Sequence, residues 1–243
     1  MRYAILAALA ATLGSAASAH ATQFVVNGDF TELSAGPGEI DVDTTVTGWS
    51  GNGGYNFVFA NANDSTGTAS PISLWTGTNG GAVSNTWNGL TASGAGNFAA
   101  MDGDYITEPL TQTITGLTVG DTYTLSFNYA FAQQTGFFGD TGQSLTASLG
   151  SFSDTLPSGG FSLPSQGFSG WSTFSTTITA TSTSETLSFL AAGNLPVPPF
   201  ALVSDVSLTG SVPESSTWAM MLVGFGGLGF AAFRSRRRVA AAA

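Results

Sequence analysis

The chain has 243 residues, with 15 acidic and five basic side chains, one histidine and no cysteine. All five basic residues are arginines near the two ends, and residues 22–210 contain 14 acids but no lysine, arginine or histidine. So acidic a stretch cannot neutralise phosphates, which excludes nucleic-acid binding. Without cysteine or histidine it also excludes disulfides, thiol nucleophiles, Ser-His-Asp triads and histidine-ligated zinc. Carboxylates, hydroxyls, amides and aromatic rings are left for chemistry.

Residues 1–21 have the pattern of a secretory signal peptide. Arg2 supplies the positive start, and residues 4–13 form a short apolar run. The small residues that follow would permit cleavage after Ala19 or Ala21. We therefore expect the rest of the chain to be exported.

The stretch from 22 to 210 is predicted to be a single β-sandwich domain. Large apolar residues alternate with small polar ones over residues 123–131, the period of a half-buried strand. Clusters of Gly, Asn, Asp and Pro separate such segments at intervals of about ten residues, which is typical of sandwiches and barrels. Further strands are expected near 23–27, 55–60, 97–101, 110–115, 144–149, 174–178, 187–191 and 200–208.

Three segments of this domain resemble a known fold family. Residues 26–30 (VNGDF) open the domain, residues 117–127 (LTVGDTYTLSF) lie in the middle, and residues 202–208 (LVSDVSL) close it. That order resembles the galactose-binding-like jelly rolls, the fold of many carbohydrate-binding modules. The resemblance implies a jelly-roll-type sandwich. Within residues 117–127, Gly120 and Asp121 suit a tight turn between two strands, because glycine tolerates positive φ.

The resemblance also implies a metal. In such jelly rolls a structural calcium ion commonly ties the exit of the first strand to the last strand, and the corresponding ligands here are Asp29 or Glu32 with Asp205. Carboxylate oxygens are the ligands that calcium prefers. The acidic run 39–43 would place three carboxylates on one face if it were extended, either as a second site or as a solvated acidic edge.

Aromatic side chains are the candidates for ligand binding. Sugar-binding modules stack pyranose rings on exposed Trp or Tyr and bond hydroxyls with Asn, Gln and Asp. Trp75 and Trp87 lie in Gly/Asn/Thr-rich stretches that read as loops, and we predict both to bind ligand. The pair Phe137-Phe138 lies between glycines, as in a loop tip. Trp49 and Trp171 begin predicted strands, which favours core packing.

A glycosidase is the catalytic alternative. Asp102, Asp104 and Glu108 offer paired carboxyl groups of the kind that glycoside hydrolysis needs. A working pair must flank the scissile bond from two sides, which three acids on one loop rarely achieve, and no cation or histidine is present to orient substrate. We therefore expect no enzymatic activity and no catalytic residue.

The C-terminal segment predicts a membrane helix. Residues 218–233 are 16 uncharged, mostly apolar residues, which span about 24 Å as a helix. A basic tail, residues 234–243, follows at once and would remain cytoplasmic, leaving the sandwich outside. Residues 211–217 form the tether between sandwich and helix. The positive-inside cluster consists of Arg234, Arg236, Arg237 and Arg238.

The order of motif, helix and arginines resembles the PEP-CTERM sorting signal, in the variant written P-E-P-x-x-W-A. Pro213, Glu214, Trp218 and Ala219 match it, and Ser215 stands where the motif has its second proline. The same tail is also labelled the ice-binding protein C-terminal domain, a name that by itself implies no ice binding. The resemblance implies a Gram-negative bacterium and processing near the motif by a membrane exosortase, with exopolysaccharide as a partner of the mature protein.

These features together predict an exported protein of the cell envelope or extracellular matrix. Its expected role is to bind or organise polysaccharide without catalysis, with calcium as the structural cofactor. A surface-coat protein with no discrete ligand is the first alternative, and a secreted glycoside hydrolase is the second. Ordered, exposed aromatic rings in a groove favour binding, whereas two carboxyl groups facing each other across about 5–9.5 Å favour hydrolysis.

Overall fold

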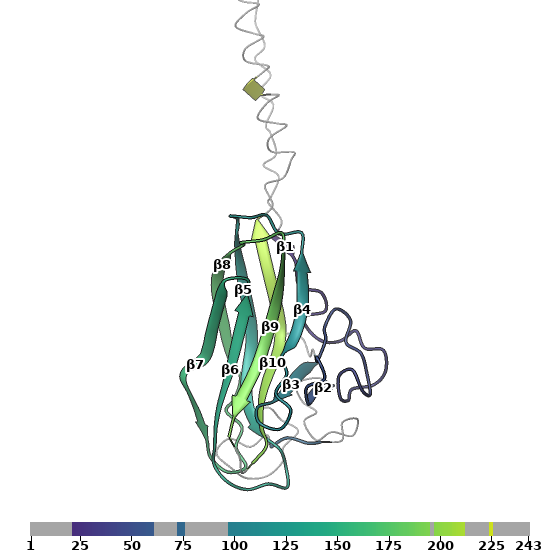
Figure 1. Ribbon diagram of the computed structural model, residues 1–243, viewed down its shortest axis with the longest axis vertical. Helices are drawn as coiled ribbons and strands as arrows, with labels where there is room; N and C mark the ends of the chain where they lie inside the picture. The colour runs from purple at the N-terminus through teal and green to yellow at the C-terminus, as the bar shows by residue number, and fades with distance from the viewer. Residues whose placement is uncertain (1–20, 61–71, 76–96, 195–196, 212–223, 226–243) are drawn as a thin grey trace, which may run out of the picture. The chain divides into compact units, whose positions relative to one another are not determined.

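The computed structural model describes residues 21–60, 72–75, 97–194, 197–211 and 224–225. Thr22–Gly210 form one compact unit, built from two antiparallel sheets packed face to face (Figure 1). The prediction of an all-β sandwich is confirmed.

The first sheet has the strand order β2-β3-β10-β5-β8, and β1 also pairs with β10. Its strands are β1 (Ala21–Gln23), β2 (Asn56–Phe59), β3 (Phe98–Asp102), β5 (Thr122–Gln133), β8 (Ser172–Thr179) and β10 (Pro199–Ser211). Strand β10 lies between β3 and β5, so the end of β3, the end of β5 and the start of β10 meet at one end of the sandwich.

The second sheet has the order β4-β9-β6-β7. Its strands are β4 (Leu110–Thr115), β6 (Thr141–Leu149), β7 (Phe152–Leu163) and β9 (Ser184–Gly193). Apolar residues of β9 and β6 alternate with hydroxyl-bearing residues, so one face of the sheet packs on the core and the other carries serine and threonine.

The main core fills the space between the sheets and contains large aromatic rings. Phe127 of β5 packs edge-on against Phe189 of β9, with ring centroids 4.9 Å apart. Trp49 lies in the same core, and its indole Nε1 donates to the carbonyl oxygens of Val26 and Asn27 at 3.2 and 3.1 Å. The predicted core packing of Trp49 is therefore confirmed.

A second core covers part of the outer face of the first sheet. The inward side chains of β5 belong to the main core, so Ala130 and Ala132 point to the other face, where they join Phe57, Phe98 and Trp171. Burial of Trp171 in this second core confirms its predicted packing role. The sequence did not predict a second core, because alanines on the polar side of an alternating strand give no apolar signal.

The other predicted strands are present except the one near 23–27, because β1 ends at Gln23, and β7 was not predicted. Its apolar alternation is interrupted by Pro157 and by Gly159 and Gly160, which have φ of +87° and +80°. The register between β6 and β7 shifts at this point, which accommodates the interruption within a strand.

The acidic run 39–43 is not extended, so the condition for placing its three carboxylates on one face is not met, and Asp41 and Asp43 are exposed as in a solvated acidic edge. Asp41 has φ of 68°, which turns the chain back on itself. The Asp41 carboxylate accepts the Gly51 N–H at 2.6 Å, and the Asp43 carboxylate accepts the Glu39 N–H at 3.0 Å. Burial and the charge of Asp43 raise the pKa of Glu39. These acids stabilise a local turn.

The predicted signal peptide, tether, membrane helix and basic tail lie outside the described residues, apart from Ala21, Ser211, Gly224 and Phe225. They include the sorting motif and the arginine cluster, so these remain predictions. Over the parts of the chain that the structure describes, no helix is long and apolar enough to cross a membrane.

Candidate functional site

A cleft of about 530 Å³ opens at the end of the sandwich where β3 and β5 end and β10 begins. Neighbouring strands place these ends side by side, since Phe200 pairs with both Asp102 and Ala132. We call this hollow the aromatic cleft. It is lined by Tyr55, Asp102, Asp104, Tyr105, Gln134, Phe137 and Pro198.

Asp102 fixes one wall of the aromatic cleft. Its side chain is 2% exposed, and Oδ1 accepts the backbone N–H groups of Asp104 at 2.7 Å and Tyr105 at 2.6 Å. Burial and the neighbouring Asp104 charge raise the pKa of Asp102, although the two backbone hydrogen bonds oppose that change. The turn therefore holds a buried acid directly beside an exposed one.

Tyr105 supplies an exposed ring next to these acids. It is 73% exposed, and its ring stands edge-on to Tyr55 with centroids 5.6 Å apart. Tyr55 is in turn held edge-on by the buried Phe57 at 4.6 Å. Burial raises the pKa of Tyr55, and the charges of Glu39 and Asp102 add to that rise. One ring is thus presented to solvent by a second ring fixed on the core.

The loop after β5 supplies another part of the rim, through Gln134 and Phe137. Phe137 and Phe138 are 41% and 64% exposed, and they lie between Gly136 and Gly139, both at positive φ. Such exposure of two adjacent phenylalanines is unusual unless they contact a partner. The expectation of a loop tip at this pair is confirmed.

Trp75 is a neighbour of this rim. Its ring centroid lies 6.4 Å from that of Phe138, and its backbone N–H donates to the Gln133 carbonyl at 2.9 Å. The side chain is half-buried, with its indole Nε1 buried and lacking a hydrogen-bond partner among the described residues. The other predicted ligand-binding tryptophan, Trp87, lies outside the described residues.

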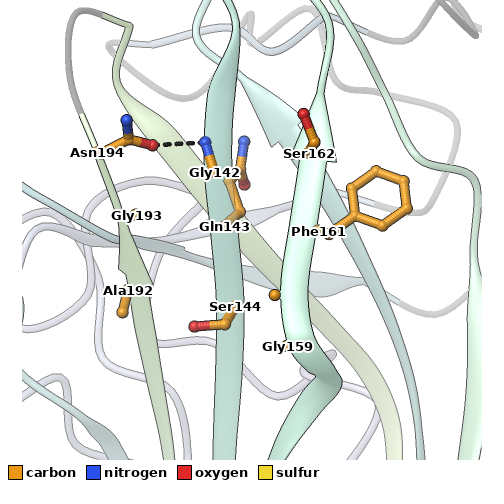
Figure 2. Close-up of a pocket in the computed structure, with 10 residues that line it drawn as sticks. Gly142, Gln143, Ser144, Gly159, Phe161, Ser162, Ala192, Gly193 and Asn194 are labelled. Atoms are coloured by element: carbon orange, nitrogen blue, oxygen red, sulfur yellow. Dashed lines mark hydrogen bonds between the residues drawn. The ribbon is translucent and has the colours of Figure 1, made fainter.

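A second hollow of about 510 Å³ lies on the outer face of β9, β6 and β7 (Figure 2). We call it the glycine groove. Asn194 closes one side and accepts the Gly142 N–H. Four of its ten lining residues are glycines, which lack a side chain and leave strand backbone uncovered. It is lined by Gly142, Gln143, Ser144, Gly159, Gly160, Phe161, Ser162, Ala192, Gly193 and Asn194.

The aromatic cleft and the glycine groove are neighbours. Gly103, between the two acids of the cleft, accepts the Gly193 N–H at 2.8 Å and donates its own N–H to Pro199 at 2.8 Å. A Cβ at Gly103 would approach the Ala192 carbonyl carbon to 2.9 Å, so only glycine allows this contact. The turn that carries Asp102 and Asp104 is thereby pinned to the end of β9.

The predicted calcium ligands lie on two adjoining segments. The Gly28 carbonyl accepts the Val206 N–H at 2.9 Å, which places Asp29 next to the bulge that contains Asp205. Asp205 accepts from the Asn128 amide at 2.9 Å and therefore faces the outer side of the sheet.

The side chains at this junction do not form a carboxylate cluster. Asp29 accepts the Thr31 hydroxyl at 3.0 Å, and Glu32 is exposed. Among the described residues no group of three or more His, Cys, Asp or Glu side chains is arranged to hold a metal. A calcium ion here would need backbone carbonyl oxygens as well as one or two of these carboxylates.

Of the acids considered for hydrolysis, Asp102 and Asp104 line the aromatic cleft and Glu108 does not. The two that meet there belong to one turn, on one wall. Tyr105 and Gln134 were not predicted from the sequence as site residues. The sequence Asp102-Gly103-Asp104 followed directly by Tyr105 could have indicated this site, because an Asp side chain that bonds the backbone after it fixes the position of the next residues.

No family model matches the chain, and no curated protein matches it. Solved structures with a similar outline include a CBM4 carbohydrate-binding module, at 18% identity over 76% of this chain and 98% of that one, with a TM-score of 0.37. A CBM61 module in complex with β-1,4-galactotriose is similar at 14% identity over 77% and 97%, with a TM-score of 0.38. A family GH115 4-O-methyl-α-glucuronidase is similar over 62% of this chain and 17% of that one, at 12% identity and a TM-score of 0.31.

Proposed function

We propose that the protein binds uncharged polysaccharide in the aromatic cleft without catalysing a reaction. The observation that carries the proposal is the exposed ring of Tyr105, held beside Asp102 and Asp104 in a hollow of ligand size. Such a ring offers an apolar face to a sugar ring, and the carboxylates and Gln134 offer acceptors and donors to its hydroxyls.

Charge selects the class of polysaccharide. Residues 22–210 carry 14 acids and no basic side chain, so the domain repels anionic chains such as those rich in uronate or sulfate. The two carboxylates in the cleft strengthen that repulsion locally. A neutral glycan experiences no such electrostatic repulsion.

The arrangement of the acids supports binding over hydrolysis. Asp102 and Asp104 come from a single turn, and Asp102 is already engaged by two backbone N–H groups. Hydrolysis needs two carboxyl groups on opposite sides of the scissile bond. The remaining lining residues of the cleft are aromatic, amide and proline side chains, and none of them supplies the second carboxyl group.

An array of neutral and acidic glycans, probed with the full chain in mild detergent, tests the proposal. We expect binding to a neutral class, and Tyr105→Ala should weaken it by about 2 kcal/mol, roughly 30-fold. Val119→Ala is the matched control, because Val119 is also an exposed apolar residue but lies in a turn outside the cleft. Binding that survives Tyr105→Ala unchanged would contradict the proposed site, and an array without any bound glycan would favour a surface coat.

The location of the protein is proposed from the sequence ends. We infer export by the signal peptide, transient retention by the C-terminal helix and exosortase processing at the PEP-CTERM-like motif, which delivers the sandwich to the cell surface or matrix. Mass spectrometry of the exported protein tests this inference. We expect a new N-terminus at residue 20 or 22 and loss of the arginine cluster, whereas an intact Arg2 and Arg238 would overturn it.

A further inference from the structure

Sheet edges are where a sandwich can join another chain, and two of its edges are covered by its own backbone. Residues 38–40 lie beside β2. The Ile40 N–H donates to the Asn56 carbonyl at 2.8 Å, and the Gly38 carbonyl accepts the Val58 N–H at 2.9 Å. Beside β4, Ser50 and Thr111 exchange both backbone hydrogen bonds at 2.9 Å. Neither edge offers a free ladder along its whole length.

The edge at β7 is blocked in another way. Pro157 has no N–H to donate, and Gly159 and Gly160 at positive φ push the strand out of register with β6. Asp154 adds a charge on the same strand. Proline, bulges and charges are the features that keep edge strands from pairing with other chains.

Strand β8 has none of these features. Ser172–Thr179 reads STFSTTIT, eight residues without proline, glycine or charge and rich in β-branched side chains. It pairs with β5 on one side and, within the described part of the chain, with no strand on the other (Figure 1). It is therefore the edge of this sandwich best suited to strand addition.

We propose that two copies of the protein associate through antiparallel pairing of their β8 strands about a two-fold axis at Thr176. Directly opposed residues in an antiparallel pair have their side chains on the same face of the sheet. Because side chains alternate between faces along a strand, each pair must join two even-numbered or two odd-numbered residues of β8. A centre at Thr176 meets this condition and leaves no residue of the strand from 173 to 179 unmatched. The resulting pairs are Thr173 with Thr179, Phe174 with Ile178, Ser175 with Thr177, and Thr176 with itself.

Both faces of this pairing are chemically matched. On the outer face, the exposed hydroxyls of β8 continue the rows formed by β5, where Thr177 already lies opposite Thr124 and Ser175 opposite Ser126. On the inner face, Ile178 of one copy would cover the half-buried ring of Phe174 in the other. Aromatic–β-branched and Thr–Thr pairs are favourable across antiparallel strands.

Charge does not oppose this contact. Neither β8 nor the segment Thr122–Tyr129 that pairs with it carries a charged side chain. The net negative charge of the domain resides on other elements, so the two β8 strands meet through neutral surfaces. An isologous pairing of this kind closes on itself, which gives a dimer rather than a filament.

A single cysteine tests the register directly, because the chain has none of its own. In the full chain, Thr176→Cys would place the two introduced thiols opposite each other at the axis, within the range that a disulfide can bridge. We expect most of the oxidised protein to migrate as a dimer on a non-reducing gel and to return to monomer on reduction. Thr186→Cys, on the exposed face of the central strand β9, should remain monomeric.

A charge exchange provides a second test that does not depend on thiol chemistry. Ser175 of one copy lies opposite Thr177 of the other across the axis. One variant has both residues changed to lysine and a second has both changed to aspartate, so each variant alone places like charges opposite each other. We expect each variant alone to sediment as a monomer and an equimolar mixture to form a dimer. The matched control carries lysines at Thr186 and Ser188 and should dimerise like the wild type.

Each result bears on β8 alone and not on glycan binding. Wild-type protein that sediments as a monomer, together with Thr176→Cys that forms no disulfide, would overturn the proposal. So would a disulfide that forms as readily from Thr186→Cys, or a mixture of charge variants that remains monomeric.

Discussion

The Asp102 carboxylate accepts the backbone N–H of Tyr105 at 2.6 Å, so a buried acid holds the chain beneath the most exposed aromatic ring of the cleft. The same oxygen accepts the Asp104 N–H, which closes an Asx turn of three residues. Position and charge of this one side chain can be separated experimentally, because asparagine keeps the acceptor oxygen and removes the charge.

We expect Asp102→Asn to raise the thermal stability at neutral pH and to lower glycan affinity. The folded-state pKa of Asp102 lies above its ordinary value of 3.8, chiefly through burial. A raised carboxyl pKa means that the folded state loses stability as the pH rises through 3.8 and then through the folded value. Melting curves from pH 3 upward should therefore show the variant and wild type converging at low pH, in the range where both states are protonated. Asp102→Ala, which also loses the turn, should be less stable than either at neutral pH.

The acid at Glu185 should behave in the opposite way. Burial raises its pKa, but the hydrogen bonds from the Thr181 hydroxyl and N–H and the Ser182 N–H outweigh burial, so the net pKa is lowered from 4.5. Its stabilising contribution is complete above pH 4.5 and is lost as the pH falls through the lowered value. Glu185→Gln should cost about 1.5 kcal/mol at pH 7, the scale of hydrogen bonds to a charged group. Denaturant unfolding should show a difference that shrinks at low pH, and a constant difference would contradict the assignment.

Gly28 is expected to tolerate no side chain. A Cβ at this position would overlap the carbonyl oxygen of Val206, at the junction where the first segment of the domain meets β10. Gly28→Ala should therefore abolish folding or lower the melting temperature severely, because the two nearest atoms belong to the Val206 backbone and cannot move aside. Gly36→Ala is the control, since nothing lies within 4 Å of its added methyl group. Equal melting temperatures for the two variants would mean that the junction is not tightly packed.

Calcium binding at the same junction remains a prediction from the resemblance to jelly rolls. If the ion ties Asp29 to Asp205, calcium at 100 times its dissociation constant should stabilise the fold by about 2.7 kcal/mol, and a chelator should remove that gain. Asp205→Asn should abolish the response, while Asp154→Asn, an exposed acid on β7, should keep it. A wild-type melting temperature that is insensitive to both calcium and chelator would exclude a structural calcium site in this domain.

The strands could be predicted from the sequence because their burial alternates with period two, as at residues 123–131, where each large side chain has a small polar neighbour. Where local geometry broke that period, prediction failed. Pro157 concealed β7 in this way. The aromatic cleft could not be predicted from the sequence, for a different reason. Tyr55, Tyr105 and Phe137 are far apart in the sequence, and they are brought together by the pairing of β2 with β3 and of β10 with both β3 and β5.

The absence of lysine and arginine between residues 22 and 210 also governs how the domain can be destroyed. Trypsin-like proteases cleave after these residues, and exposed loops such as the one carrying Phe137 and Phe138 are ordinarily where they nick a folded protein. Here they find no bond to cut, folded or unfolded. The sandwich is therefore protected from an entire class of protease by its composition alone, and a tryptic digest would return it within one fragment.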